Sequence, residues 1–384
     1  MSEQAEAAGP PPDDESQLCL ADVERLAARH MPAAVRDFVN GGSGDELTLG
    51  LNRAALDSLT VVPRVLAGNA DCDLNAKLVR STASAPLAVA PMAYHRLVHP
   101  GGEVEMARAA RTAGVPFAVS MLSSCPLEDI AAVGGCLWFQ LYWLRDRGRM
   151  RELIRLAERN NCEALVLTVD APVMGRRLRD IRNAFTLPPE VTGAILDPDR
   201  PSEAHERTDG MSAVAAHTST MFDPAVGWAD VSWVRAQTRL PLVLKGILDP
   251  EDACRAAAAG ADAVVVSNHG GRQLDGAVAA VSALPSVVEA LAGRCQVLFD
   301  SGVRSGRDVL KALALGASGV LVGRPLLWGL AADGHRGALR VLELLRLELS
   351  DALRLSGCAG VARARRLTVL PTFPSYAVAP NGVR

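Results

Sequence analysis

The sequence contains eight cysteines, but none of them forms a Cys-x-x-Cys pair. Zinc sites and the disulfide frameworks of small secreted domains depend on closely spaced cysteines, which this chain of 384 residues does not offer. We therefore expect no metal centre and no disulfide framework. Scattered thiols of this kind are typical of a protein in the reducing cytoplasm.

The sequence also lacks a targeting segment, a membrane span and a charge excess. Its start, MSEQAEAAGPPPDDESQ, is acidic and has no apolar core, unlike a signal peptide. No run of about 18 uninterrupted apolar residues is present, so we expect no membrane span. The net charge of -3 gives no general attraction to nucleic acid or to an anionic membrane.

Apolar residues, by contrast, are abundant and form eight short runs. They make up 49% of the chain, enough to bury one large core. The runs are apolar on both faces, as in strands of a buried parallel sheet, and Ala-rich helical segments separate most of them. This alternation predicts an α/β fold, a (β/α)8 TIM barrel. The runs begin at Ala85, Val115, Leu137, Ala164, Pro241, Ala263, Gln296 and Gly319.

A doubly wound parallel sheet is the rival fold. It would normally have fewer strands and a glycine-rich turn after the first one. The segment after the first run here is PMAYHRL, which contains no glycine. The barrel is therefore the favoured fold.

The segments around the barrel differ in composition. We expect residues 1–16 to be a disordered tail and residues 17–80 to form an N-terminal helical segment. The barrel spans 81–367. It includes a long polar loop after the fourth strand, at 188–230, which is a lid or is disordered. Residues 368–384 are expected to be a C-terminal tail.

Local signals place three helices in these segments. One opens at Met31-Pro32 and ends at Gly41-Gly42, and a second runs over about 45–59. The third, LRVLELLRLELSDALRLSG, is amphipathic and should pack on the barrel or on a second subunit. In the 188–230 loop we expect His205 and His217 to be solvated rather than metal ligands.

Polar residues follow seven of the eight runs. In this fold the carboxyl ends of all strands meet at one mouth, where active sites lie. Their convergence predicts a functional site rather than a solvated surface. The residues are Ser120, Gln140, Tyr142, Thr168, Asp170, Lys245, Ser267, His269, Arg272, Asp300, Arg304, Gly323 and Arg324.

The sixth run leads into the most distinctive segment, VVVSNHGGRQLDGA at 264–277. A buried strand here delivers His269 and Arg272 on one turn, with Gly270 and Gly271 between them. A core histidine is the alternative, but a histidine directly before two glycines belongs at the barrel mouth. The last two runs end in DSGVRSG and VGRP, whose glycines and arginines favour a phosphate site at this place in a barrel.

These segments resemble the FMN-dependent 2-hydroxy-acid oxidase and dehydrogenase family over about 22–367. SNHGGRQLDGA is the most specific shared motif, and LTVDAPVMGRR, FQLYW, LVLKG, DSGVRSG and LVGRP follow in the family's order. DFVNGGSG, AVAPMAYHRL, WFQLYWLRD and GRRLRDIRN are most similar to the members that oxidise hydroxymandelate. Such members act in hydroxyphenylglycine supply for peptide antibiotics.

The resemblance implies a role for each catalytic residue. His269 matches the base, and Asp170 the carboxylate that orients it and stabilises the imidazolium. Arg272 and Arg177 match the two arginines that bind the substrate carboxylate, for which a planar guanidinium is well suited. Tyr142 matches a residue that hydrogen-bonds the substrate; a tyrosine on the rim is the alternative.

Spacing alone would assign Arg177 to the surface charges of GRRLRDIR, and only the motif match reverses this. Its neighbour Arg176 is expected on the solvated side. Lys245 matches the cation that stabilises reduced flavin at N1/C2=O, and an ordinary ion pair with a strand-end carboxylate is its alternative.

The implied cofactor is FMN. Its ring and ribityl chain are expected to contact Ala90, Pro91, Met92, Ala93, Ser120, Gln140, Thr168, Lys245 and Ser267. Its phosphate is expected among Asp300, Ser301, Gly302, Arg304, Gly323 and Arg324, with Asp300 on a ribityl hydroxyl.

Two departures from the family pattern concern the substrate. Phe38 stands where glycolate oxidase-like members have a substrate-binding tyrosine, and Leu122 where they have a tryptophan. Both changes make the pocket more apolar, which favours mandelate or 4-hydroxymandelate over glycolate.

The resemblance implies oxidation of an (S)-2-hydroxy acid to the 2-oxo acid, with O2 as electron acceptor and with a homotetrameric assembly. A dehydrogenase for an aliphatic, lactate-like substrate with another acceptor is the main alternative. An FMN barrel of another reaction class and a phosphate-binding barrel without catalysis also remain open. The FMN barrel of another reaction class would not need His269, Arg272 and Arg177 together, and flavin absorbance of the purified protein would exclude the barrel without catalysis.

Overall fold

The computed structural model describes residues 17–68, 72–196, 203–206, 210 and 212–372. The predicted tail over 1–16 lies outside these residues, as do 373–384 of the predicted C-terminal tail. Within the part described, no helix is long and apolar enough to cross a membrane.

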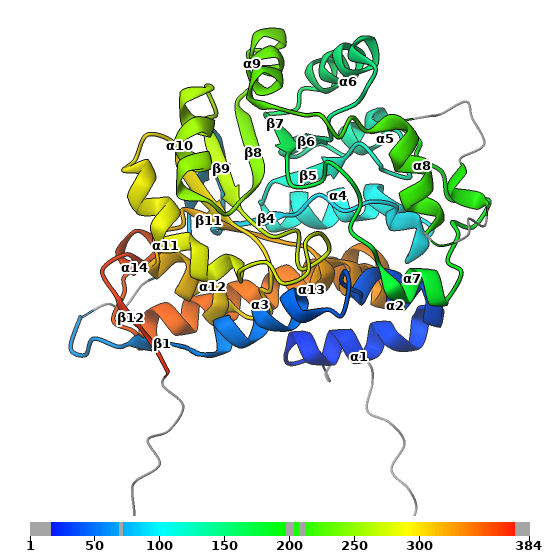
Figure 1. Cartoon of the computed structure of the whole chain (residues 1–384). Coiled ribbons are helices and arrows are strands. Elements are labelled where there is room, and N and C mark those ends of the chain that lie inside the picture. The colour runs from blue at the N-terminus through cyan, green and yellow to red at the C-terminus, as the bar shows by residue number, and fades with distance from the viewer. Residues whose placement is uncertain (1–16, 69–71, 197–202, 207–209, 211, 373–384) are drawn as a thin grey trace, which may run out of the picture.

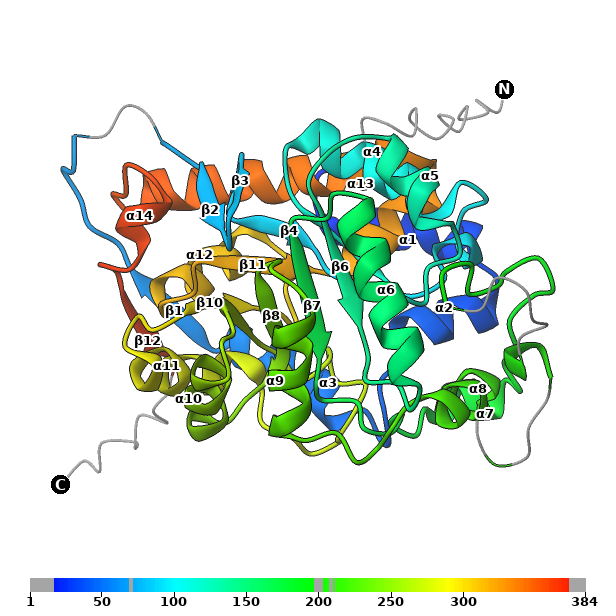
Figure 2. The ribbon, with the colours of Figure 1, turned by 90° about the horizontal axis from the view of Figure 1, so that it is seen from above.

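Eight parallel strands close into a barrel, so the prediction of a (β/α)8 fold is confirmed (Figures 1 and 2). Each predicted apolar run contains one of the strands. The closing pair is β11 and β4, with Val320 opposite Leu87 and Val322 opposite Val89. In chain order the strands are β4 (Leu87–Val89), β5 (Phe117–Ser120), β6 (Leu137–Leu141), β7 (Ala164–Thr168), β8 (Leu242–Ile247), β9 (Ala263–Val266), β10 (Gln296–Phe299) and β11 (Gly319–Val322).

Small side chains and one tryptophan fill the barrel interior. Trp138 is fully buried among alanines and valines of the other strands, and its indole N–H donates to Ser81 Oγ at 3.1 Å. Ser81 belongs to a hairpin of β2 (Ala76–Leu78) and β3 (Ser81–Ala83), whose Leu78 packs into the same cluster. The hairpin was not predicted. Its strands have only three residues each and leave no periodic signal.

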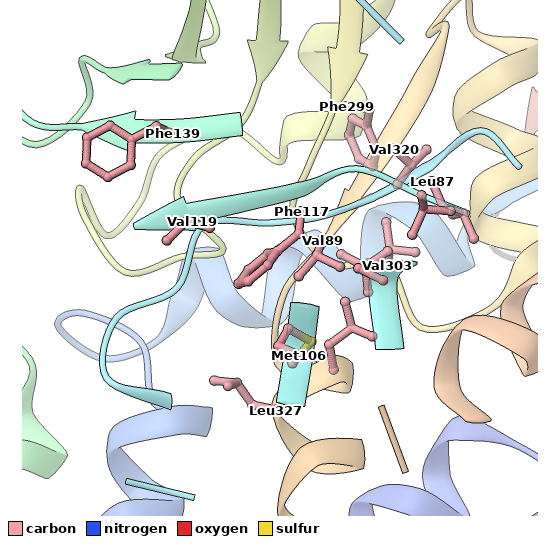
Figure 3. Packing of buried hydrophobic residues seen from close by; sticks show 14 of the residues in the cluster. Leu87, Val89, Met106, Phe117, Val119, Phe139, Phe299, Val303, Val320 and Leu327 are labelled. Atoms are coloured by element: carbon pink, nitrogen blue, oxygen red, sulfur yellow. The ribbon is translucent and has the colours of Figure 1, made fainter. Parts of the chain in front are cut away.

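Helices surround the barrel and bury their apolar faces against the strands. In Figure 3, Met106 of α4 lies among Val89, Phe117 and Leu327. The surrounding helices are α4 (Gly102–Ala113), α5 (Leu127–Ala132), α6 (Arg147–Arg159), α9 (Trp228–Gln237), α10 (Pro250–Ala258), α11 (Ala280–Leu291) and α12 (Gly306–Ala314).

The N-terminal segment contains three helices rather than the two predicted. The expected pair corresponds to α2 (Ala33–Asn40) and α3 (Leu47–Asp57). The additional helix, α1 (Leu20–His30), buries Leu20, Val23 and Ala27. It packs against α13 (Arg324–Leu355), beside which it runs in Figure 1.

The C-terminal part departs from the prediction. The amphipathic segment is confirmed as the second half of α13, which breaks at Asp333 and Gly334. After α14 (Val361–Ala364), residues 368–371 form β12 (Thr368–Pro371) rather than the start of a tail. This strand pairs antiparallel with β1 (Leu59–Val62). The pairing joins residues about 300 positions apart, so no local pattern could indicate it.

The 188–230 loop is partly folded. It contains the short helix η2 (Glu203–His205) and α8 (Ala213–Met221), and it follows α7 (Leu178–Arg182). The expectation that His217 is solvated is wrong, because His217 is 6% exposed on the buried face of α8. His205 is half-buried, and its Nδ1 lies 3.0 Å from Leu187 O.

Candidate active site

A cavity opens at the carboxyl ends of the barrel strands and encloses about 1170 Å³ of empty space, its open mouth included. Most of the predicted site residues meet there, although they come from α2, from the residue before α7 and from all eight strands or the segments that follow them. Those that line it are Phe38, Ala90, Pro91, Met92, Ala93, Ser120, Tyr142, Thr168, Arg177, Lys245, His269, Arg272, Asp300, Ser301, Gly302, Arg304, Gly323 and Arg324.

Three further predicted residues, Gln140, Asp170 and Ser267, lie behind the cavity wall and hold lining side chains. Gln140 Oε1 accepts a hydrogen bond from Ser120 Oγ at 3.0 Å, and Gln140 Nε2 donates to Thr168 Oγ1 at 3.1 Å. Direct contacts of Gln140 and Ser267 with the cofactor therefore stay predictions. The structure shows instead that both side chains hydrogen-bond residues that line the cavity.

His269 and Asp170 form a hydrogen-bonded pair. Asp170 Oδ1 lies 2.9 Å from His269 Nδ1, which assigns the proton to Nδ1 and leaves Nε2 as the acceptor. Tyr142 Oη lies 3.4 Å from Nε2. Burial lowers the pKa of His269 below the usual 6.5, and the Asp170 carboxylate offsets only part of this effect. His269 is therefore a neutral base at pH 7.

The turn that presents His269 has three successive residues with positive φ. The angle is 59° at His269, 63° at Gly270 and 74° at Gly271. A Cβ at Gly270 would meet Arg324 Nη1 at 2.7 Å, and one at Gly271 would meet the backbone nitrogen of Leu49 at 2.6 Å. The two glycines therefore let Arg324 and α3 approach the turn closely, and His269 alone projects a side chain from it.

Lys245 is a buried cation in the cavity wall. Its Nζ lies 2.8 Å from Asp300 Oδ2 and donates to Ser267 Oγ at 3.0 Å, while Ser267 Oγ donates to Asp300 Oδ2 at 2.8 Å. Burial alone would lower the pKa of Lys245, but the carboxylates of Asp300 and Asp170 more than offset it and the pKa is raised. Lys245 therefore stays charged. The ion pair with a strand-end carboxylate, which was the alternative prediction for Lys245, is present as the pair with Asp300.

Arg177 and Arg272 both lie near the ring of Phe38. Their guanidinium carbons lie 5.8 and 5.4 Å from the ring centroid. Arg272 Nη1 donates to the carbonyls of Phe38 and Gly41, at the end of α2, at 2.9 and 2.8 Å. Burial lowers the pKa of both guanidinium groups, and the charge of Arg177 adds to the effect on Arg272. A carboxylate between them would favour the charged forms of both. Arg176 is exposed, as expected.

Arg304 and Arg324 are a second pair of cations in the cavity lining; both are half-buried and lie in the segments that follow β10 and β11. Arg304 lies over the Trp328 ring at 4.7 Å. Arg324 donates to the carbonyls of Gly270 and Gly41, at 2.9 Å in each case. Burial lowers the pKa of Arg304 to about 10 and that of Arg324 to about 9. Two half-buried cations in glycine-rich segments after the strands suit the predicted phosphate.

The cavity as a whole fits an anionic, partly apolar cofactor. Its described lining includes five cationic side chains but one carboxylate, Asp300. The apolar residues 90–93 line the same cavity, and a Cβ at Gly323 would come within 3.4 Å of Met92 Sδ. The residues for the phosphate, the ring and the cation beside it are thus present together, as FMN requires.

Several lining residues were not predicted. Tyr94, Leu97 and Val98 follow β4, Met174 follows β7, and Val214 lies on α8. Apolar loop residues have no spacing that marks them as ligand contacts. Of these residues, Tyr94 could most easily have been predicted, because it directly follows the predicted segment 90–93.

This combination of barrel and site defines a class of flavin enzyme. The chain belongs to the FMN-dependent dehydrogenase family, whose family model matches residues 27–370, and FMN is its cofactor.

Among individual proteins, the chain is 56% identical over 350 residues to the 4-hydroxymandelate oxidase of Amycolatopsis orientalis, covering 91% of this chain and 97% of that protein. It is 43% identical over 356 residues to an L-lactate oxidase of Nostoc sp., covering 90% and 95%. The solved structure of a mandelate oxidase with (S)-4-hydroxymandelic acid has 55% sequence identity and a TM-score of 0.90, covering 92% of this chain and 99% of that one.

Proposed function

We propose that the protein oxidises an (S)-2-hydroxy acid with an aryl side chain, mandelate or 4-hydroxymandelate, to the 2-oxo acid. The observation that carries the proposal is His269, a neutral base in the same cavity as the buried Arg177 and the half-buried Arg272. The similarity to an enzyme that is named for 4-hydroxymandelate supports the aryl side chain.

Each residue has a definite task in this reaction. Arg177 and Arg272 bind the substrate carboxylate, and Tyr142 hydrogen-bonds the substrate beside His269. His269 Nε2 takes up the proton that the substrate releases, and Asp170 stabilises the resulting imidazolium. Bound FMN would supply the acceptor for the hydride equivalent that leaves the substrate carbon.

Lys245 holds a fixed positive charge in the same cavity. Because reduced flavin is an anion, the buried Lys245 would favour the reduced form of an FMN bound in this cavity. The ion pair with Asp300 keeps Lys245 protonated for this task.

The apolar part of the cavity supports an aryl substrate. Phe38 stacks on Phe185 with centroids 4.6 Å apart, and Tyr142 stacks on Phe222 at 4.7 Å. Leu122 is buried in the lining. An aryl ring would bury apolar surface here, at about 25 cal/mol per Å², whereas glycolate would contact little of it.

The proposal extends to the electron acceptor, the oligomeric state and the cellular compartment. O2 is the electron acceptor that we propose, and we propose a homotetramer in the cytoplasm. The eight unpaired cysteines support a reducing compartment.

The decisive experiment is anaerobic reduction of the FMN-loaded protein by a panel of 2-hydroxy acids, followed by readmission of air. Mandelate and 4-hydroxymandelate should bleach the flavin faster than lactate or glycolate, and air should restore the colour with formation of peroxide. A mandelate-to-lactate ratio of kcat/KM below one would refute the aryl substrate. Bleaching without reoxidation by air would favour the dehydrogenase alternative.

A further inference from the structure

Tyr94 has a buried hydroxyl to which the described residues offer no hydrogen bond. Tyr94 is 1% exposed, and its Oη is among the buried polar atoms without a partner. Buried hydroxyls are usually paired, because an unpaired one has lost its bonds to water without replacement. Burial, with a smaller contribution from Tyr142, raises the pKa of the phenol, so the hydroxyl remains a donor at neutral pH.

The residue belongs to the apolar wall of the candidate active site. Tyr94 lines the cavity with Leu97, Val98 and Leu122. Its backbone N–H donates to Leu122 O at 3.1 Å, which joins Tyr94 to the residue that replaces the family's tryptophan. Tyr142 lines the same cavity. Tyr94 thus adds a polar group to an otherwise apolar stretch of the lining.

A buried carboxylate holds this part of the wall rigid. Glu103 Oε1 accepts hydrogen bonds from the backbone N–H of His95 at 3.0 Å and of Ser124 at 2.9 Å, and Oε2 accepts one from Ser124 Oγ at 2.7 Å. These bonds join the segments that follow β4 and β5. They also help to fix Tyr94 at a φ of 57°, a conformation that non-glycine residues keep only where their surroundings enforce it.

We propose that Tyr94 is a specificity residue that recognises a hydroxyl at the para position of the substrate's aryl ring. The inference rests on the proposed function, which puts the carboxylate at Arg177 and Arg272 and the aryl ring against Leu122. A para-hydroxyl is the substituent that adds a donor and an acceptor at the far end of such a ring. It would give the Tyr94 hydroxyl the partner it lacks, whereas mandelate would leave it unpaired.

The test is Tyr94→Phe, which removes the hydroxyl and keeps the ring. The ratio of kcat/KM for 4-hydroxymandelate to that for mandelate should fall by about two- to tenfold, the range for one neutral hydrogen bond. The value of kcat/KM should fall for 4-hydroxymandelate and stay nearly unchanged for mandelate. The thermal midpoint of the ligand-free variant should be equal to or above that of the wild type, because an unpaired buried hydroxyl has been removed.

Trp143→Phe is the matched control. Among the described residues the buried Trp143 indole N–H also has no hydrogen-bond partner, but Trp143 is not among the residues that line the cavity. This variant should leave the substrate ratio unchanged.

A wild-type comparison keeps the inference testable if Tyr94→Phe does not fold. 4-Methylmandelate matches 4-hydroxymandelate in size but cannot pair with Tyr94, so it should be the poorer substrate. An unchanged ratio in Tyr94→Phe, an equal loss for both substrates, or wild-type preference for the methyl compound would overturn the inference. Failure of the wild type to oxidise any aryl substrate would instead overturn the proposed function.

Discussion

At the scale of single residues, the position of one nitrogen decides what His269 can do. Asp170 binds Nδ1, so the acceptor Nε2 lies next to Tyr142 at the cavity. Burial then keeps the imidazole neutral. The geometry and the protonation state of His269 therefore both fit the role of a base.

We expect His269→Ala to retain FMN and to lose 2-hydroxy-acid oxidation. The cofactor contacts assigned to β10 and β11 remain, while a positioned base contributes about 10²- to 10⁴-fold to a rate. Flavin absorbance measures FMN content, and anaerobic bleaching measures the reaction. His30→Ala, at an exposed position on α1, is the control and should match the wild type. Bleaching of His269→Ala at nearly the wild-type rate would remove His269 from the role of base.

The pH dependence of kcat/KM should report the depressed pKa of His269. The free enzyme is active when the imidazole is neutral, so activity should be flat at pH 7 and fall only as the pH drops through a pKa below 6.5. In Asp170→Asn the carboxylate that raises this pKa is gone, so the acid limb should move to still lower pH while the rate falls. A wild-type acid limb centred above pH 7 would contradict this assignment.

Phe38 should set the preferred size of the substrate. In Phe38→Tyr the added hydroxyl joins the two arginines that lie near this ring, where it can bind a carboxylate and narrow the pocket. The ratio of kcat/KM for mandelate to that for lactate should fall several-fold relative to the wild type. A ratio that stays constant or rises would show that position 38 does not act on substrate size.

At the scale of elements, the barrel could be predicted because its pattern is local. A strand buried on both faces is a short apolar run, and all eight such runs form barrel strands. The polar residues that follow them meet in one cavity for the same geometric reason. The pairing of β1 with β12 and the hairpin of β2 and β3 could not be predicted, because they depend on contacts between distant or very short segments.

The candidate active site also combines residues that a local sequence pattern predicts with residues that only the folded structure reveals. The roles of His269 and Arg272 could be inferred from a motif, but the orphaned hydroxyl of Tyr94 is visible only when its neighbours are known. Likewise, Val214 reaches the cavity because α8 folds over it, in a loop whose sequence indicated only a lid or disorder.

The ends of β10 and β11 should control FMN retention. Arg304→Ala and Arg324→Ala each remove charge-assisted hydrogen bonds to the phosphate, worth about 1.5–3 kcal/mol, so FMN should bind about ten- to a hundredfold more weakly. Titration of the apoprotein with FMN measures this. Arg307→Ala, on the exposed face of α12, is the matched control and should bind FMN as the wild type does. If both variants bind FMN with unchanged affinity, the phosphate lies elsewhere.

At the scale of the whole molecule, exposed apolar side chains gather near the mouth of the barrel. Leu47 and Leu51 of α3 and Leu274 and Val278 of the segment after β9 form this rim patch, and all four are exposed. Thr48 Oγ1 donates to the carbonyl of Ala277 at 3.2 Å, so α3 and the segment after β9 adjoin. Exposed apolar surface of this kind marks a site of association.

We therefore expect the rim patch to contribute to the proposed tetramer, whose mass would be four times the 40.4 kDa of the chain. Leu274→Asp places a charge at the most exposed position of the patch, where burial against a second copy would cost the full desolvation of a carboxylate. Size-exclusion chromatography with light scattering should show a smaller assembly for this variant. Leu355→Asp is the control, because Leu355 is equally exposed at the end of α13 but outside the patch, and it should keep the wild-type mass. A wild type that elutes as a monomer would reject the tetramer, and an unchanged mass for Leu274→Asp would place the subunit interface on another face.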